Sequence, residues 1–225
     1  MAGPASRANA ELAPAAGQAR LVVVKLGGSV IRSGELAAWL DAIAAAPCPI
    51  VVVPGGGALA DEVRDRQTEL GFGDRAAHRM ALLAMDQLAW AVAGLRQGFI
   101  VGTTEPELRA ALGRGHVAVW APYALVAGRT DVEESWRLTS DSLALWLAAR
   151  IGAACCVLIK SIRRQGTRAD AAELAQSGIV DAAFPSMLRD AGVPAFLLGR
   201  GEQKAFAASL AAKDADQTNS AAAIV

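Results

Sequence analysis

Residues 21–29 read Leu-Val-Val-Val-Lys-Leu-Gly-Gly-Ser, a short apolar run that ends in two glycines. The length of the run and its β-branched residues predict a strand buried on both faces of a sheet. Gly27 and Gly28 stop this strand and let the backbone approach a ligand closely, because they carry no side chain. Lys25 adds a positive charge near the strand end. We therefore expect a central strand with an anion-binding turn at its carboxyl end.

A second stretch repeats this pattern. Residues 50–57 read Ile-Val-Val-Val-Pro-Gly-Gly-Gly, and a helical pattern follows them. Gly55, Gly56 and Gly57 cost backbone entropy when they are ordered, which favours a close backbone approach over a plain turn. The helix N-terminus behind them favours negative charge. Since ligands bind at the carboxyl ends of parallel strands, the two glycine loops are expected to lie side by side and to hold one phosphate group.

The rest of the chain alternates between strand-like and helix-like segments. Three more strands are expected at 117–120, 155–159 and 195–198, and helices at 35–46, 59–70, 74–97, 106–112 and 142–151. Residues 123–137 are expected to be mostly loop. Such alternation predicts an α/β fold, with a parallel sheet that is covered on both faces.

The composition excludes several classes of protein. The chain has 225 residues, of which 53% are hydrophobic, enough for a sizeable core. Lys+Arg and Asp+Glu both total 22, so no net positive charge favours nucleic acid or an anionic membrane. No apolar stretch is long enough for a membrane helix. Residues 1–20 are rich in Ala, Pro and Gly and lack the pattern of a secretory signal. We expect a disordered extension there and a cytoplasmic protein.

Cysteine and histidine give no sign of a metal site. Cys48, Cys155 and Cys156 lack the spacing of zinc ligands, and we expect the adjacent Cys155 and Cys156, which lie in an apolar run, to be buried, reduced thiols. His78 and His116 are far apart in the sequence, so each is expected to be an ordinary surface or core histidine.

A third polar motif, Thr-Ser-Asp-Ser at residues 139–142, comes directly before a helical pattern. Ser140 is a good N-cap residue. Two interpretations of Asp141 are open: it complements the helix dipole, or it orients catalytic lysines through charge-assisted hydrogen bonds. The familiar nucleotide motifs are absent, since the chain has neither the Gly-x-Gly-x-x-Gly fingerprint nor a Gly-x4-Gly-Lys-Ser/Thr loop.

Taken in order, the three motifs resemble the amino acid kinase superfamily over roughly residues 21–199. That group includes acetylglutamate, glutamate, carbamate, uridylate and isopentenyl phosphate kinases. The resemblance implies a three-layer αβα sandwich with a mainly parallel central sheet over residues 21–225. It places the acceptor in an N-terminal half, about 21–125, and the nucleotide in a C-terminal half, about 126–225. It also implies ATP and Mg²⁺ as cofactors, a small-molecule acceptor, and a homo-oligomer.

By the same resemblance, Lys25 neutralises the transferring phosphoryl group and Asp141 orients the lysines. Gly28, Gly55 and Gly56 would donate backbone N–H groups to phosphate oxygens. The full expected substrate- and phosphate-binding set is Gly27, Gly28, Ser29, Gly55, Gly56, Gly57 and Ser140. These roles suit phosphoryl transfer, in which positioning and charge stabilisation supply most of the catalysis.

A narrower resemblance rests on residues 120–123, Trp-Ala-Pro-Tyr, and on residues 136–148 around the third motif. Both stretches resemble the small kinases of methanofuran-type cofactor synthesis. Those enzymes phosphorylate 5-(aminomethyl)-3-furanmethanol phosphate to the diphosphate. The resemblance thus favours a compact acceptor that already carries a phosphate.

The chain also departs from the family pattern. Many members have Thr-Asp-Val-Asp-Gly after the fourth strand, where residues 160–166 here read Lys-Ser-Ile-Arg-Arg-Gln-Gly. A Gly-Gly-Met-x3-Lys segment and the usual Gly-Thr near the C-terminus are missing as well. Lys160 either supplies a second catalytic charge, as a lysine does in uridylate kinases, or only ends the strand.

Three functions therefore remain open. The preferred one is an ATP-dependent small-molecule kinase. The second is a non-catalytic nucleotide- or oxyanion-binding protein on the same fold, which the altered stretch at 160–166 favours. The third, an unrelated α/β enzyme, requires the order of the three motifs to be a coincidence.

Overall fold

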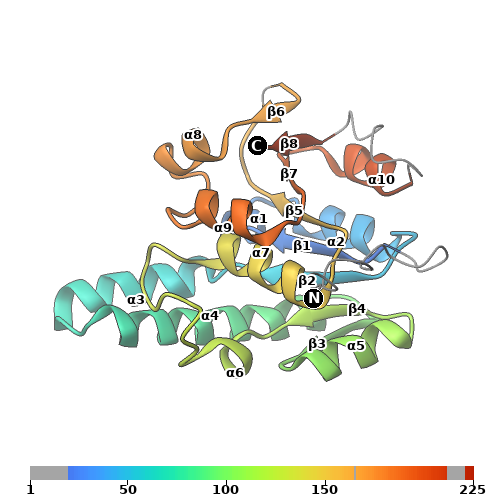
Figure 1. Ribbon diagram of the computed structural model, residues 1–225. Helices are drawn as coiled ribbons and strands as arrows, with labels where there is room; N and C mark the ends of the chain where they lie inside the picture. Colours follow the sequence, from blue (N-terminus) through green and yellow to red (C-terminus); the bar gives the residue numbers. More distant parts are fainter. Residues whose placement is uncertain (1–19, 165, 212–220) are drawn as a thin grey trace, which may run out of the picture.

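An eight-stranded sheet forms the middle of the protein in a computed structural model that describes residues 20–164, 166–211 and 221–225 (Figure 1). The strand order is β3-β4-β2-β1-β5-β7-β8-β6. Neighbouring strands pair in parallel, except that β7 and β8 are antiparallel. The strands are β1 Val22–Leu26, β2 Ile50–Pro54, β3 Phe99–Gly102, β4 Val117–Trp120, β5 Cys155–Ile159, β6 Arg168–Ala169, β7 Ala195–Leu198 and β8 Ala222–Ile224.

The sheet confirms the prediction of a mainly parallel α/β fold. All five predicted strands are present, as β1, β2, β4, β5 and β7. Strands β3, β6 and β8 were not predicted; they are short and lie toward the two edges of the sheet. Of residues 1–20, only Arg20 is described, so the expected N-terminal extension lies outside the described residues.

Helices follow most of the strands. All five predicted helices are present, as α2, α3, α4, α5 and α7. The segment 123–137, expected to be mostly loop, contains only the short helix α6. The helices are α1 Gly28–Ile31, α2 Leu36–Ala44, α3 Gly57–Leu70, α4 Asp74–Gly94, α5 Glu105–Gly113, α6 Tyr123–Val126, α7 Ser140–Ile151, α8 Ala171–Gln176, α9 Phe184–Ala191 and α10 Gln203–Ala211.

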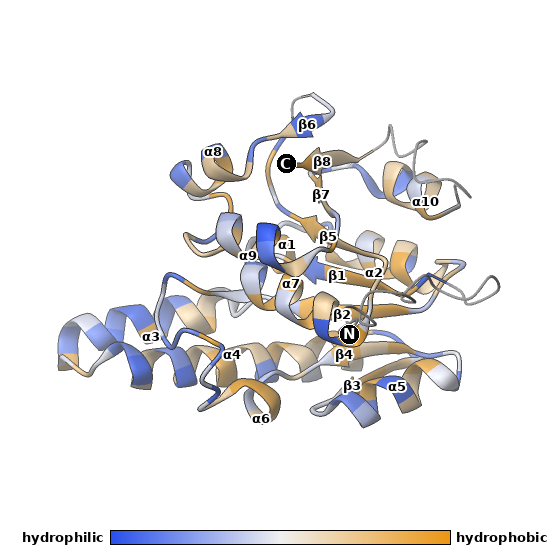
Figure 2. Cartoon of the chain, viewed as in Figure 1, coloured by the Kyte–Doolittle hydropathy of each residue, from blue (hydrophilic) through white to orange (hydrophobic). Residues whose placement is uncertain are grey.

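The helices cover both faces of the sheet, as the alternating side chains of the strands require. Val23 of β1 belongs to a core that α5, α7, α8 and α9 complete. Val22 and Val24 face the other way, into a core with α1, α2 and α10. Figure 2 shows the central strands largely in hydrophobic colours and the outer helix α3 largely in hydrophilic ones. The protein is thus an αβα sandwich.

Strand β1 holds a central place in this sheet, between β2 and β5. Lys25 is in register with Val53 of β2 and with Leu158 of β5. Every residue of these three strands is buried. The carboxyl ends of β1, β2 and β5 therefore meet at one edge of the sheet.

Cys155 and Cys156 on β5 are buried free thiols, as predicted. Within the described part of the chain, we find no helix long and apolar enough to cross a membrane.

Candidate active site

The two glycine loops touch each other at this edge. A Cβ atom placed on Gly28 would lie 2.5 Å from the Cα of Gly57, and one placed on Gly55 would lie 2.8 Å from the backbone nitrogen of Gly28. Such distances are too short for real side-chain carbons, so the loops can pack this closely only as glycines. Gly57 also has a φ of 52°, a left-handed conformation that favours glycine. The prediction that the loops lie side by side is confirmed.

The backbone N–H groups of the loops divide into two sets. Gly27 donates to the carbonyl of Ile159 at 3.0 Å, and Gly55 donates to the carbonyl of Leu26 at 2.8 Å. The expectation that Gly55 offers its N–H to a phosphate is therefore wrong, because the main chain between β1 and β2 already uses it. Gly28 and Gly57 begin helices α1 and α3, and the first N–H groups of a helix have no acceptor within that helix. These groups are available to an anion.

Beside the loops, Asp141 bridges two lysines. Its Oδ1 lies 2.7 Å from Nζ of Lys25, and its Oδ2 accepts a hydrogen bond from Nζ of Lys160, also at 2.7 Å. Lys25 lies on β1, Lys160 directly follows β5, and Asp141 is the second residue of α7. The three side chains are 5%, 12% and 6% exposed. The hypothesis that Asp141 contacts both lysines is confirmed, so Asp141 does more than complement the helix dipole and Lys160 does more than end the strand.

The charges of this cluster are strongly coupled. Burial would raise the pKa of Asp141, but Lys25 and Lys160 outweigh it and hold that pKa below its ordinary value. Burial and the charge of Lys25 lower the pKa of Lys160 to about 8, although Asp141 acts in the opposite direction. At neutral pH, Lys160 is thus still mostly protonated. The cluster then carries two positive charges and one negative charge, an excess suited to an anionic ligand.

A second carboxylate fixes the start of α7. Asp181 accepts hydrogen bonds from the backbone N–H groups of Thr139 and Ser142 at 2.9 and 3.0 Å, and from the hydroxyls of both residues. Thr139 is the N-cap of α7, so the helix begins at Ser140, and the prediction of Ser140 as N-cap is wrong by one position. Burial and the charge of Asp141 raise the pKa of Asp181, against the lowering effect of its hydrogen bonds. Asp181 therefore sets the position from which Asp141 reaches the lysines.

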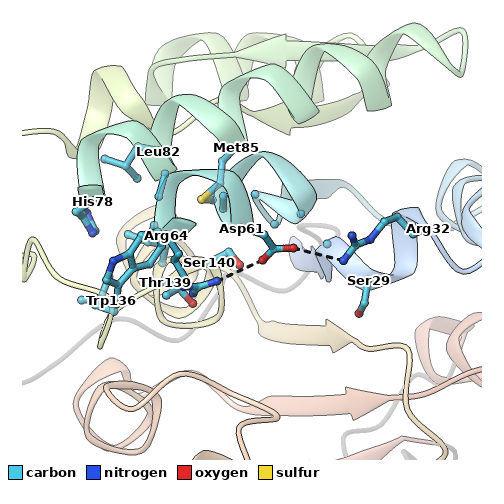
Figure 3. A pocket seen from close by; sticks show the side chains of 18 residues that line it. Ser29, Arg32, Asp61, Arg64, His78, Leu82, Met85, Trp136, Thr139 and Ser140 are labelled. Atoms are coloured by element: carbon cyan, nitrogen blue, oxygen red, sulfur yellow. Dashed lines mark hydrogen bonds and ion pairs between the residues drawn. The ribbon is translucent and has the colours of Figure 1, made fainter. Parts of the chain in front are cut away.

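A cavity of about 250 Å³ opens beside the glycine loops. Of the predicted binding residues, it takes in Gly28, Ser29, the three glycines at 55–57 and Ser140, whereas Gly27 is not part of its wall. Helices α3 and α4 form one side of the cavity, and the segment 136–140 forms another. Figure 3 shows Ser29 and Arg32 at one end, His78 and Trp136 at the other, and Leu82 and Met85 along the side of α4.

Several polar residues of this wall were not predicted from the sequence. Asp61 lies 3.4 Å from both Arg32 and Arg64, in ion pairs that are half exposed (Figure 3). The guanidinium of Arg64 also stacks on the ring of Trp136, 4.2 Å from its centroid. Exposed ion pairs of this kind are weak, so both arginines can turn to an incoming anion at little cost. The sequence could have indicated Asp61 and Arg64, because they lie four and seven residues after Gly57 and so share one face of the predicted helix.

Residues 162–164 of the altered stretch pack against the loop after β7. Ile162 accepts a hydrogen bond from the backbone N–H of Arg200 at 2.8 Å, and Arg164 pairs with Glu202 at 2.7 Å. Glu202 in turn accepts the N–H of Gly199 at 2.6 Å. Where many members of the family have two aspartates after the fourth strand, this chain thus has Arg164, which connects the loops at the carboxyl ends of β5 and β7.

The described residues do not form a metal centre of their own, since they contain no group of three or more His, Cys, Asp or Glu side chains that could hold an ion. Both oxygens of Asp141 are already paired with lysines. Mg²⁺ often binds through substrate phosphates and few protein ligands. The residues of the site therefore fit a Mg²⁺ ion that is bound mainly by the phosphates of a nucleotide.

A comparison with protein families identifies one family for this chain. The model of the amino acid kinase family matches residues 20–164. The (5-(aminomethyl)furan-3-yl)methyl phosphate kinase of Methanocaldococcus jannaschii is 29% identical over 128 residues, or 56% of this chain. The match spans 58% of that relative, less than two thirds of its length.

Solved structures show the same fold. The uridylate kinase of Archaeoglobus fulgidus has a TM-score of 0.64 at 17% identity, with 91% of this chain and 99% of that chain covered. The UMP kinase of Ureaplasma parvum also has a TM-score of 0.64, at 13% identity, with 92% and 97% covered. The aspartate kinase of Synechocystis has a TM-score of 0.57 at 17% identity, and the match covers 80% of this chain and 37% of that one.

Proposed function

The chain belongs to the amino acid kinase family, and from that premise we propose that it is an ATP-dependent small-molecule kinase. One observation carries the proposal: Asp141 holds the ammonium groups of Lys25 and Lys160 beside two touching glycine loops. Buried positive charge next to free backbone N–H groups stabilises the negative charge of a phosphoryl group in transfer. Stability alone does not explain two lysines buried on one carboxylate, because a buried ion pair is often no more stabilising than apolar residues of similar volume.

For the acceptor, we propose the substrate that the name of the Methanocaldococcus jannaschii relative prints, (5-(aminomethyl)furan-3-yl)methyl phosphate, here called the aminomethylfuran phosphate. A cavity of about 250 Å³ suits a compact ligand of this kind. Arg32 and Arg64 supply positive charge for its phosphate. Leu82, Met85 and Trp136 supply an apolar surface for its ring.

In the proposed reaction, an oxygen of the acceptor's phosphate attacks the γ-phosphorus of ATP. The bond between that phosphorus and the bridging oxygen of ADP breaks, and the products are ADP and the diphosphate of the acceptor. Lys25 and Lys160 neutralise the phosphoryl group during transfer, while Gly28, Gly56 and Gly57 direct N–H groups at its oxygens. Asp141 keeps the two lysines in place, so little reorganisation is needed at the moment of transfer.

We also propose a division of labour between the two halves of the chain. Residues of about 21–125 form most of the acceptor cavity, and residues of about 126–225 would bind ATP across the carboxyl ends of β5 and β7. Mg²⁺ supplies charge neutralisation on the ATP phosphates when it is bound. A cytoplasmic location and a homo-oligomer complete the proposal. The side chains of Leu83 and Trp90 on α4, which are 43% and 66% exposed, favour a second copy of the chain as a partner. Light scattering on the purified protein tests the homo-oligomer.

The direct test is turnover. The purified protein is incubated with ATP, Mg²⁺ and the aminomethylfuran phosphate, and the diphosphate and ADP are quantified by phosphorus NMR and by a coupled assay. We expect equal amounts of both products, and none when either substrate is omitted. Release of ADP without the acceptor would contradict the proposal, because it would show hydrolysis only.

The non-catalytic alternative makes a different prediction. A nucleotide- or oxyanion-binding protein of this fold would bind ATP or a phosphate ester without turning it over, as the altered stretch 160–166 suggests. Calorimetric titration with a non-hydrolysable ATP analogue, run alongside the turnover assay, separates the two. Binding without product formation from any phosphorylated acceptor would favour the alternative.

A further inference from the structure

His78 has one ring nitrogen without a partner at the wall of the cavity. The residue lies on α4, is 4% exposed, and belongs to the cavity wall (Figure 3). Its Nδ1 lies 3.3 Å from the backbone carbonyl oxygen of Ser135. Its Nε2 is buried and has no hydrogen-bond partner among the residues that the structure describes. An unpaired buried polar atom is costly, and at the wall of a cavity it indicates a ligand contact.

The contact with Ser135 decides the tautomer of this imidazole. A carbonyl oxygen can only accept a hydrogen bond, so Nδ1 must carry the proton. In a neutral imidazole, Nε2 is then an acceptor with a free lone pair. A ligand that forms a hydrogen bond with Nε2 must therefore supply the donor.

The ring is neutral at physiological pH. Burial lowers the pKa of His78 below its ordinary value, and this effect outweighs the raising effects of the Ser135 carbonyl and of the carboxylates of Glu134 and Glu133. Arg79, from the same helix, acts with burial to lower it. The imidazole thus adds no positive charge to its end of the cavity, in contrast to Arg32 at the end near Ser29.

The cavity is accordingly polarised from one end to the other. Near Ser29 and Arg32 it offers positive charge and backbone N–H groups, which suit a phosphate. At the other end it offers the lone pair of His78 and the ring of Trp136, on which the guanidinium of Arg64 stacks. Aromatic faces attract cations, so once Arg64 has turned to the phosphate, this ring suits a small positively charged donor.

We propose that Nε2 of His78 accepts a hydrogen bond from a primary ammonium group on the acceptor, at the end opposite to its phosphate. This inference rests on the proposed function and specifies how the cavity recognises its substrate. His78 would thereby select phosphorylated amines over phosphate esters of the same shape that lack the amine. A site built to bond a donor discriminates strongly against an analogue without it, because the buried acceptor is then left unpaired.

Two ligands and two variants test the proposal. The ligands are the aminomethylfuran phosphate and an analogue with a methyl group in place of the aminomethyl group. In His78→Asn, the amide nitrogen can still donate to the Ser135 carbonyl, but no atom reaches the position of Nε2. In His78→Gln, the longer side chain can bring its amide oxygen close to that position. Dissociation constants are measured by calorimetry, and melting temperatures report whether each variant is folded.

We expect the wild-type protein to bind the amine at least about tenfold more tightly than the methyl analogue, a ratio equal to 1.4 kcal/mol. His78→Asn should lose this preference and bind both ligands with the weaker affinity. His78→Gln should recover part of it. A merely structural role would give the reverse order, with His78→Asn close to wild type and His78→Gln impaired, and would leave the ratio unchanged in both.

The outcomes separate this inference from the proposed function. If the wild type phosphorylates both ligands with equal efficiency and binds them equally, the His78 inference is wrong and the kinase proposal stands. If it binds the amine selectively but phosphorylates neither ligand, the inference stands and the kinase proposal fails. If it binds neither ligand, the inference is overturned.

Discussion

Gly28 approaches Gly57 so closely that it has no room for a side chain, since a Cβ on Gly28 would meet the Cα of Gly57 at 2.5 Å and its nitrogen at 2.6 Å. We expect Gly28→Ala to force the loops apart, at a cost of about 1–3 kcal/mol in unfolding free energy, the usual cost of overpacking. Activity should fall with it, because the N–H groups move away from the phosphoryl group. Urea denaturation and kcat/KM measure the two effects.

Gly113→Ala is the matched control for this substitution. Gly113 is the last residue of α5, and a Cβ there would meet nothing within 4 Å. Its stability and activity should stay near wild type. Normal activity in Gly28→Ala would show that the close contact between the loops is not needed for transfer.

Lys25→Ala should lower kcat by a factor on the order of 10² or more, because it removes a charge that acts mainly in the transition state. The KM for the acceptor should change much less. Lys204→Ala, which removes an exposed lysine on α10, is the control and should be neutral. Steady-state kinetics decide the matter, and a Lys25→Ala protein with near-normal kcat on the accepted substrate would exclude a catalytic role.

Asp141→Asn should reduce both activity and stability. The sequence alone suggested a helix-dipole contribution of about 0.3–1 kcal/mol. Because Asp141 neutralises two buried ammonium groups, its replacement should instead cost about 3–5 kcal/mol, the range for breaking a buried ion pair. Asp74→Asn removes an exposed acid from the first turn of α4 and isolates the dipole effect. Equal losses of unfolding free energy in the two variants would argue against the bridging role.

Catalytic efficiency should decline as the pH rises through about 8. Lys160 is a cation below its pKa of about 8 and neutral above it, so alkaline conditions remove one of the two charges that face the phosphoryl group. The profile of kcat/KM reports the groups of the free enzyme. Lys160→Arg keeps the charge at higher pH and should move the alkaline decline upward. An unchanged profile in this variant would assign the decline to another group.

Asp181→Ala should destabilise the protein by about 1–3 kcal/mol, the cost of leaving buried donors without an acceptor. Because those donors belong to Thr139 and Ser142, the start of α7 should shift and carry Asp141 with it. We therefore expect kcat to fall while acceptor affinity changes little. Asp190→Asn, at an exposed position of α9, is the control. A variant of Asp181 with lower stability but normal kcat would limit its role to folding.

Much of the fold and the centre of the site could be predicted from the sequence. Strands β1 and β2 are continuous apolar runs that end in glycines. This pattern is local in the sequence, so it can be recognised without knowledge of tertiary contacts. Lys25 and Asp141 could be singled out from their places beside predicted elements, and Lys160 from the family resemblance, although only the structure shows their contacts. Strand β3 was missed because it is a four-residue strand at the sheet edge, with Ile100 exposed.

The cavity wall was harder to predict, for a physical reason. Arg64 and His78 lie on helices whose orientation against the sheet decides which side chains face the ligand. Asp181 lies 39 residues after Ser142, and no local pattern relates the two. His78 was expected to be an ordinary surface or core histidine, and the structure shows it buried. The role of its unpaired Nε2 as an acceptor follows from the contact of Nδ1 with the carbonyl of Ser135, which lies 57 residues away in the sequence.

The place of β1 between two parallel neighbours has a consequence for local opening of the protein. The backbone of Lys25 is held from β2 on one side and β5 on the other, and every residue of the three strands is buried. Hydrogen exchange at the amides of β1 should therefore require global unfolding, as it does for the innermost strands of other proteins. Loops and helix ends around the cavity can open many times while the backbone of Lys25 keeps its position.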